Sequence, residues 1–114
     1  MAEHELAIEL LWWEGCPSTP EAVSDLRAAM TELGLDPDAV EVREIATNEQ
    51  AERERFAGSP TIRVNGRDVQ PPQDGEPVGL TCRVYRLRDG RISATPDPAD
   101  VREALEQAIE RSRA

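Results

Sequence analysis

The segment from Glu5 to Trp13 constrains the fold of this 114-residue chain most, because apolar side chains occupy both of its alternating faces. One face carries Leu6, Ile8, Leu10 and Trp12, and the other carries Ala7, Leu11 and Trp13. Such a strand is typical of the centre of a sheet that has chain packed on both sides. The length is the common size of one domain, so we predict a single domain over residues 1–114 with this strand at its centre.

A turn and a helix follow this strand directly. Residues 14–20 read EGCPSTP, in which glycine and proline end the strand and Cys16 lies between them. Either Ser18 or Thr19 can cap a helix that has proline at an early position. Apolar residues then recur at three- and four-residue steps, which predicts a helix over about Pro20–Leu33. The cysteine therefore lies in the turn before a helix.

The middle of the chain predicts two more strands and a short helix. Alternation over residues 40–45 predicts a strand that a right-handed crossover would place parallel to the first. Thr47 and Gln50 form a possible capping box for a short charged helix ending near Phe56. Asn65-Gly66, between two alternating segments, predicts a tight antiparallel hairpin.

The remainder predicts a loop and a final helix. Residues 70–79 hold three prolines and two glycines and are expected to be loop, while residues 81–87 form either a strand or irregular chain. Asp97 and Pro98 open a last amphipathic helix. The order β-α-β-α-β-β-α predicts an α/β fold with a mixed sheet and helices on both faces.

Charge and hydropathy limit the classes of partner. The net charge of −10 disfavours nucleic acid and anionic lipid, which bind through an excess of Lys and Arg. No run approaches the roughly 18 apolar residues of a membrane span. The first residues, among them Glu3 and His4, do not resemble a secretory signal. We therefore expect a cytoplasmic protein without a membrane partner.

The two cysteines, Cys16 and Cys82, are far apart in the sequence. They form neither the paired spacing of a zinc knuckle nor a Cys-x-x-Cys motif, so we expect no metal site and no cofactor. In a reducing compartment both are expected to be free thiols. Any pairing between them must come from the fold.

Two motifs carry a resemblance to a known family. The order of elements, with WWEGCP at residues 12–17 and GSPT at residues 58–61, resembles the thioredoxin and glutaredoxin superfamily over nearly the whole chain. It is also similar to small bacterial thioredoxin-like proteins sometimes labelled alkylmercury lyase. The resemblance implies a thioredoxin-like fold, a reactive Cys16 and a cis peptide bond at Pro60. Thr19 stands where dithiol members have a second cysteine, so the resemblance is to monothiol members.

The position of Cys16 favours a reactive thiol. A helix N terminus stabilises the thiolate, which is the nucleophilic form. The alternative is a buried, inert cysteine, which a Gly-Cys-Pro turn argues against. The hairpin returns the chain toward Cys16, so Cys82 at the end of the next loop either resolves an intermediate on Cys16 or packs in the core beside Val84.

The backbone beside a cis Pro60 can pair with the backbone of a substrate, whereas the alternative is an ordinary loop proline. We assign one of Trp12 and Trp13 to the core and the other to the substrate surface. The predicted substrate-binding residues are Trp13, Pro17, Ser59, Pro60 and Thr61. The arginines at positions 63, 67, 83 and 86 either supply a local positive field or are solvated strand edges.

Three functions fit these residues. The first is a thiol-disulfide oxidoreductase acting on a protein or a low-molecular-weight thiol or disulfide, with Cys16 as nucleophile and Cys82 as resolving residue. The second is soft-metal or organomercurial handling by the two thiols. The third is a non-catalytic thioredoxin-like binding module. His4, the only histidine, offers no obvious base for Cys16, so a Cys-His hydrolase is disfavoured.

Overall fold

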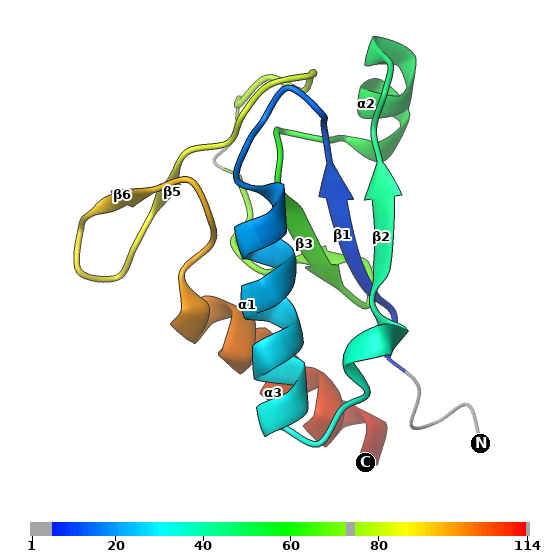
Figure 1. Ribbon diagram of the computed structural model, residues 1–114, viewed down its shortest axis with the longest axis vertical. Helices are drawn as coiled ribbons and strands as arrows, with labels where there is room; N and C mark the ends of the chain where they lie inside the picture. The colour runs from blue at the N-terminus through cyan, green and yellow to red at the C-terminus, as the bar shows by residue number, and fades with distance from the viewer. Residues whose placement is uncertain (1–5, 73–74, 114) are drawn as a thin grey trace.

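A four-stranded mixed sheet runs through the centre of the molecule (Figure 1). The computed structural model describes residues 6–72 and 75–113. The strands stand in the order β2-β1-β3-β4, with bounds Ile8–Trp12 (β1), Glu41–Glu44 (β2), Thr61–Val64 (β3) and Arg67–Asp68 (β4). β1 runs parallel to β2 and antiparallel to β3. The strand predicted to be central, β1, therefore has a neighbouring strand on each side. His4 lies outside the described residues.

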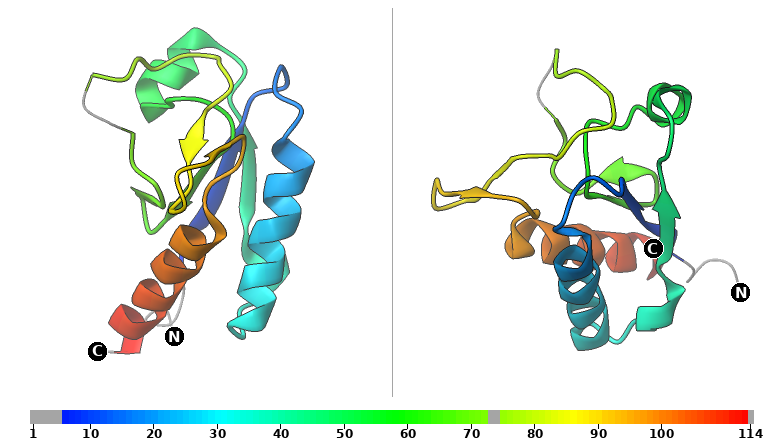
Figure 2. Two further views of the ribbon diagram at one scale, coloured as in Figure 1. Left: turned by 90° about the vertical axis from the view of Figure 1, so that its left-hand side faces the viewer. Right: turned by 45° about the horizontal axis from the view of Figure 1, so that its top comes forward.

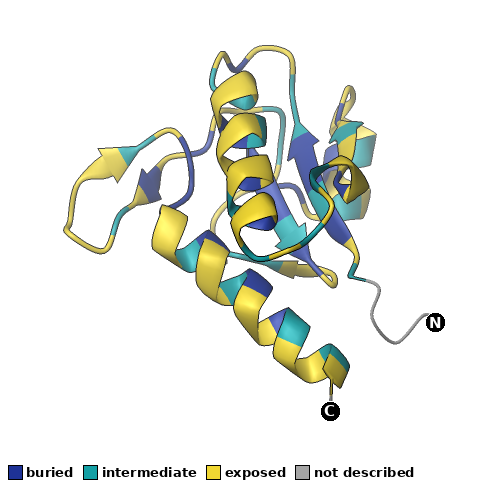
Figure 3. Cartoon of the chain, turned by 60° about the horizontal axis from the view of Figure 1, so that its bottom comes forward, coloured by how far each residue is buried: buried dark blue, intermediate teal, exposed yellow. Residues whose placement is uncertain are grey.

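Two long helices share one face of this sheet. The helices are α1 (Thr19–Glu32), α2 (Asn48–Glu54) and α3 (Pro98–Arg113), with a short 3-10 turn η2 (Pro37–Ala39) before β2. The main apolar core joins α1, α3, β1 and β3, centred on Leu10, Leu26 and Leu105, each at most 1% exposed. Figure 3 shows α3 buried toward the sheet and exposed on its outer side. The apolar faces of both long amphipathic helices are therefore buried against this sheet.

The other face of the sheet is covered only at one end. Leu11 packs there with Ile45, Ala51 and Phe56, of which Ala51 lies on α2. The rest of that face carries charges, among them Arg43, whose guanidinium lies 2.9 Å from a Glu9 carboxylate oxygen. The expected helices on both faces are therefore present in part, because α2 reaches only the end of the second face.

Helix α1 begins and ends within one residue of its prediction. Ala22, Leu26 and Met30 face the core at four-residue steps. Gly34 follows the helix with a φ of +80°, and the N–H of Leu35 donates to the carbonyl of Met30 at 2.8 Å. A left-handed residue at this point is what glycine supplies without steric cost.

The capping box predicted for α2 is confirmed. The Thr47 hydroxyl accepts from the N–H of Gln50 at 3.1 Å, and the Gln50 side chain accepts from the N–H of Thr47 at 3.2 Å. The helix ends two residues before Phe56, because Arg55 takes a left-handed conformation with φ of 54°. Phe56 then turns into the second apolar cluster.

The predicted hairpin is also confirmed. β3 and β4 pair antiparallel, and Asn65 and Gly66 both have positive φ, at 52° and 82°. A two-residue turn with two left-handed residues matches the twist of the flanking strands. The hairpin sends the chain after β4 back toward the end of the sheet where β1 finishes (Figure 1).

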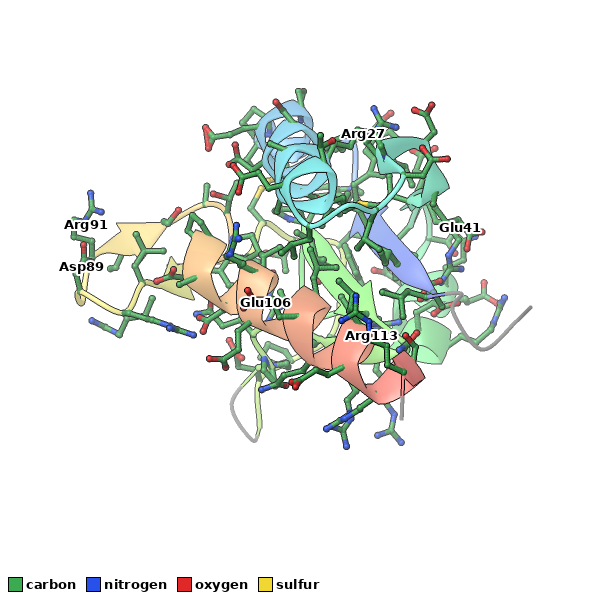
Figure 4. All side chains as sticks on the ribbon, turned by 90° about the horizontal axis from the view of Figure 1, so that it is seen from below. Arg27, Glu41, Asp89, Arg91, Glu106 and Arg113 are labelled. Atoms are coloured by element: carbon green, nitrogen blue, oxygen red, sulfur yellow. The ribbon has the colours of Figure 1, made fainter. Side chains whose placement is uncertain are left out.

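A second hairpin joins β5 (Tyr85–Arg86) to β6 (Ile92–Ser93). Residues 81–87, left open between strand and irregular chain, thus hold a strand of two residues, and the pairing with β6 was not predicted. The hairpin projects from the body as the yellow and orange segment in Figure 2, and its tip carries Asp89 and Arg91 (Figure 4). Its turn holds Gly90, whose φ is +92°. Asp89-Gly90 is the signal that predicts it, since the dipeptide stands between two short β-forming segments.

The last helix begins as predicted. The Asp97 carboxylate accepts from the N–H of Ala99 at 2.8 Å, and its second oxygen accepts from the N–H of Arg88 at 2.7 Å. Asp97 therefore joins the turn of the second hairpin to the start of α3. Across residues 6–72 and 75–113, the structure has no helix with the length and apolar character needed to cross a membrane.

Candidate thiol site

Cys16 lies in the turn between β1 and α1, at the N-terminal end of the helix. Its N–H donates to the carbonyl of Trp13 at 3.1 Å, which closes the turn. The side chain is 6% exposed, and its sulfur lies 3.4 Å from the carbonyl oxygen of Ser59. Ser18 is the N-cap residue of α1, but its hydroxyl lies 3.3 Å from the Cys16 sulfur instead of capping the helix. The Ser18 side chain therefore contacts the Cys16 thiol and does not cap the helix N–H groups.

The two tryptophans take different places around this turn. The ring of Trp13 lies over Gly15, where a Cβ would come within 2.3 Å of the ring, so a larger residue there would displace the ring. Trp13 packs against the second apolar cluster, and Trp12 packs against the main core. Trp12, and not the Trp13 selected from the sequence, lines the pocket beside Cys16.

The fold brings Cys82 to Cys16. The N–H of Ser59 donates to the carbonyl of Thr81, and the N–H of Arg83 donates to the carbonyl of Ser59, both at 2.8 Å. These two bonds place Cys82 opposite Ser59 in an isolated parallel bridge. The Cys82 sulfur lies 3.9 Å from the carbonyl oxygen of Gly15, and Cys82 is near enough to Cys16 for each thiol to shift the pKa of the other. Cys82 is exposed and is not a core residue.

The two thiols have opposite electrostatic settings. Burial alone would raise the pKa of Cys16, but hydrogen bonds from Cys82, Ser18 and Ser59 outweigh burial, and the pKa is lowered. The same contact raises the pKa of Cys82 to about 11, because a thiol that donates to Cys16 holds its proton. Burial and the negative charge of Cys16 act in the same direction. Cys16 is therefore the first of the two to ionise, and Cys82 keeps its proton.

The residues around Pro60 are buried, and their polar groups are used internally. The Ser59–Pro60 peptide bond is cis, in agreement with the expectation from the sequence. The Ser59 hydroxyl accepts from the N–H of Trp13 at 3.0 Å, and the Tyr85 hydroxyl donates to the carbonyl of Pro60. The Thr61 hydroxyl donates to a backbone carbonyl at 2.6 Å. Among the predicted substrate-binding residues, Pro17 is exposed beside the thiol, whereas these three face the interior.

Arg83, one of the four arginines expected to supply a positive field or to be solvated at a strand edge, is instead buried and holds the segment that carries Cys82. The Arg83 side chain is 5% exposed and lies 2.7 Å from a carboxylate oxygen of Asp68. It also donates to the Thr61 hydroxyl at 3.2 Å and to the carbonyl of Gln70. Its guanidinium carbon lies 4.4 Å from the ring centroid of Tyr85. Of the other three arginines, Arg63 pairs with Glu54, Arg67 is exposed, and Arg86 accepts at its carbonyl from the Gln70 side chain.

Gly58 allows Arg83 to approach the turn before Pro60. Its φ is +138°, and a Cβ there would lie 3.1 Å from the backbone nitrogen of Arg83 and 3.2 Å from its Cα. Contacts this short with backbone atoms cannot be relieved by rotating a side chain. A glycine at position 58 is therefore required by both its conformation and its neighbour.

A pocket of about 780 Å³ opens beside Cys16, and Ser59 is not among the residues that line it. Its apolar wall consists of Trp12, Pro17, Pro20 and Val23, and Arg27 adds a positive charge two turns along α1. Mostly apolar pockets with a few polar groups are typical binding sites for small molecules. Cys16 itself is one of the residues that line this pocket.

Neither a search for metal-binding side chains nor comparison with known proteins adds to the description of the site. Over residues 6–72 and 75–113, no group of three or more His, Cys, Asp or Glu side chains is arranged to hold a metal ion. Comparison with protein-family models, with curated proteins and with solved structures finds no match for this chain. The geometry of the two thiols is therefore the basis for a functional interpretation.

Proposed function

We propose that this protein is a thioredoxin-like thiol-disulfide oxidoreductase in which Cys16 is the nucleophile and Cys82 the resolving cysteine. The observation that carries the proposal is that Ser59 contacts the Cys16 sulfur and pairs with Cys82, which brings together two thiols whose pKa values are shifted in opposite directions. A two-cysteine exchange cycle needs a thiolate beside a protonated thiol. The thiolate attacks the external disulfide first, and the thiol attacks the resulting mixed disulfide only in the second step.

The arrangement of the chain supports the thioredoxin-like part of the proposal. The cysteine turn joins β1 to α1, β1 runs parallel to β2, and β3 and β4 follow antiparallel. The cis peptide bond before β3 lies beside Cys16, whose sulfur contacts the Ser59 carbonyl. These are the features that the sequence resemblance implies for the family.

The cycle begins with attack of the Cys16 thiolate on one sulfur of an external disulfide. The external S–S bond breaks, Cys16 forms a mixed disulfide, and the first external thiolate leaves and takes up a proton. Cys82 then loses its proton to water or to the leaving thiolate and attacks the Cys16 sulfur. The second external thiol leaves, and a Cys16–Cys82 disulfide remains, so the two electrons lost by the protein reduce the external disulfide. A low-molecular-weight dithiol returns the protein to its reduced form.

The same geometry delays the second step, the attack of Cys82 on the mixed disulfide, until the first step is complete. In the reduced protein, the hydrogen bond to Cys16 and its negative charge keep Cys82 protonated. Once Cys16 is in a mixed disulfide, its negative charge is gone and the pKa of Cys82 falls. The resolving thiol is therefore released for attack only after the first step.

The test is the rate of iodoacetamide labelling at each cysteine as a function of pH, read by mass spectrometry. We expect Cys16 to titrate below the ordinary range of a thiol and Cys82 to titrate at about 11. Mild oxidation is expected to give an intramolecular Cys16–Cys82 disulfide. C16S is expected to abolish thiol-dependent reduction, and C82S to trap the mixed disulfide. An ordinary Cys16 pKa with no disulfide would favour the binding-module hypothesis.

A second candidate function rests on the contact between the two sulfur atoms. Two adjacent thiolates suit the linear coordination of a soft cation such as mercury(II) or copper(I). Titration of the reduced protein with mercury(II) is expected to show one strong site that is lost in the C16S/C82S double variant. Undiminished binding by that variant would rule out this function.

A further inference from the structure

The backbone edge beside Pro60 is already occupied by the protein itself. Ser59 uses both its N–H and its carbonyl to pair with Thr81 and Arg83, at 2.8 Å each. An extended polypeptide that added itself to this edge would need those same two groups. Ser59 is fully buried, so no second layer of chain can reach it from outside.

The occupying segment, residues 81–83, is anchored from behind. The Arg83 side chain reaches through the buried network to Asp68, 2.7 Å away, and to the carbonyl of Gln70. Breaking a buried ion pair of this kind leaves an uncompensated charge in the interior, which is costly. The segment is therefore a fixed part of the fold and stays on the edge while the thiols react.

We propose that residues 81–83 are a built-in occupant of the substrate edge, with Cys82 standing where the cysteine of a polypeptide substrate would stand. This inference rests on the proposed oxidoreductase function and narrows it. The external substrates of Cys16 are small disulfides, and extended protein segments are excluded.

The open side of Cys16 indicates the chemistry of such a disulfide. Ser59 contacts the Cys16 sulfur, and a pocket walled by Trp12, Pro17 and Val23 also reaches Cys16 without including Ser59 or Cys82 in its lining. Arg27 lies along the same pocket and is exposed. A short apolar arm ending in a carboxylate matches this wall and this charge.

The experiment measures the rate at which three disulfides convert the reduced protein to its Cys16–Cys82 form, followed by acid quenching and mass spectrometry. The probes are 3,3′-dithiodipropionate, which is anionic, cystamine, which is cationic, and insulin as a polypeptide disulfide. Each rate is divided by the rate for a small model thiol, which corrects for the probe's own reactivity. We expect the corrected rate for dithiodipropionate to exceed that for cystamine about fivefold, and insulin to be the slowest.

Arg27 supplies a matched pair of variants. R27E is expected to reverse the order of the anionic and cationic probes. R53E changes the net charge equally at an exposed arginine outside the pocket and is expected to leave the order unchanged. An equal response of the two variants would overturn the role of the pocket.

A measurement on the unaltered protein tests the occupied edge directly. The amide protons of Ser59 and Arg83 are expected to be protected from hydrogen exchange to nearly the level of the central strand β1. Exchange at the rate of exposed loops, or insulin reacting as fast as the small probes, would overturn the inference and leave the oxidoreductase function standing. If none of the three disulfides oxidises the protein and Cys16 titrates as an ordinary thiol, the proposed function itself fails.

Discussion

The two thiols meet at one point but are supported in different ways. Cys16 begins a helix whose inner face, through Ala22, Leu26 and Met30, is packed in the main apolar core. Cys82 lies on irregular chain that is held by one buried ion pair and a few directed hydrogen bonds. Apolar packing spreads its stabilisation over many contacts, whereas a buried charge depends on a single partner. The Cys82 side is therefore the more sensitive to a single substitution.

The largest effect is expected from D68A, on the Cys82 side. It leaves the Arg83 guanidinium buried without its carboxylate, so we expect the free energy of unfolding to fall by about 3–5 kcal/mol. Urea denaturation of the reduced protein measures it. D68N retains an oxygen acceptor and is expected to lose less. A loss in D68A as small as that of an exposed ion pair would contradict the comparison.

Next comes L26A, on the Cys16 side. Leu26 is 1% exposed, and deleting its side chain is expected to cost about 3 kcal/mol through lost burial and a residual cavity. Because many other contacts hold α1, the labelling pH profile of Cys16 is expected to stay that of the unaltered protein. L33A, at the half-buried end of the helix, provides the milder control. A shifted profile in L26A would show that the core also sets the thiol pKa.

A smaller effect is expected from T47A, which removes the N-cap of α2. That helix leads into the turn at residues 58–61, which pairs with the segment that carries Cys82. The loss is expected to be about 1 kcal/mol, measured by thermal or urea unfolding. T31A, whose exposed hydroxyl bonds only a carbonyl within its own helix, is the control and is expected to change stability less.

The smallest effect is the pH dependence of stability of the reduced protein. The lowered pKa of Cys16 means that the unfolded chain holds more protons below the ordinary value of 9.0, so stability rises with pH toward that point. The raised pKa of Cys82 means that the folded protein holds more protons between 9.0 and about 11, so stability then falls. Urea midpoints across this range, compared with the C16S/C82S variant, test both slopes.

Burial also raises the pKa of Tyr85, which adds a fall in stability above pH 10 to both proteins. The difference between the two pH curves therefore isolates the thiols. A difference that stays constant from neutral pH to pH 11 would contradict the opposed settings of Cys16 and Cys82.

Local signals predicted most of the fold. The Asn65-Gly66 turn, the capping box of Thr47 and the end of α1 before Gly34 depend on a few consecutive residues, and the structure has each of them. The second hairpin carried an equally local signal in Asp89-Gly90, which the sequence analysis overlooked. Its strands are only two residues long, too short for alternation to be visible.

The candidate site was less predictable because half of it depends on long-range contacts. Cys16 stood out from its own turn, but the position of Cys82 depends on the path of an irregular loop. The ion pair between Asp68 and Arg83 joins residues on either side of that loop, and no periodic pattern connects them. The N–H and the carbonyl of Ser59 are likewise paired with the chain itself, at Thr81 and Arg83, which lie more than twenty residues further along.

Gly58 shows that a residue without a reactive atom can affect the position of a cysteine sulfur. Any larger residue there would push the backbone of Arg83 outward by a few tenths of an ångström, and Cys82 is its immediate neighbour. Exchange between two cysteines requires their sulfurs to come within bonding reach. The absence of one methyl group, at a residue with no reactive atom, therefore helps to fix the position of Cys82 relative to Cys16.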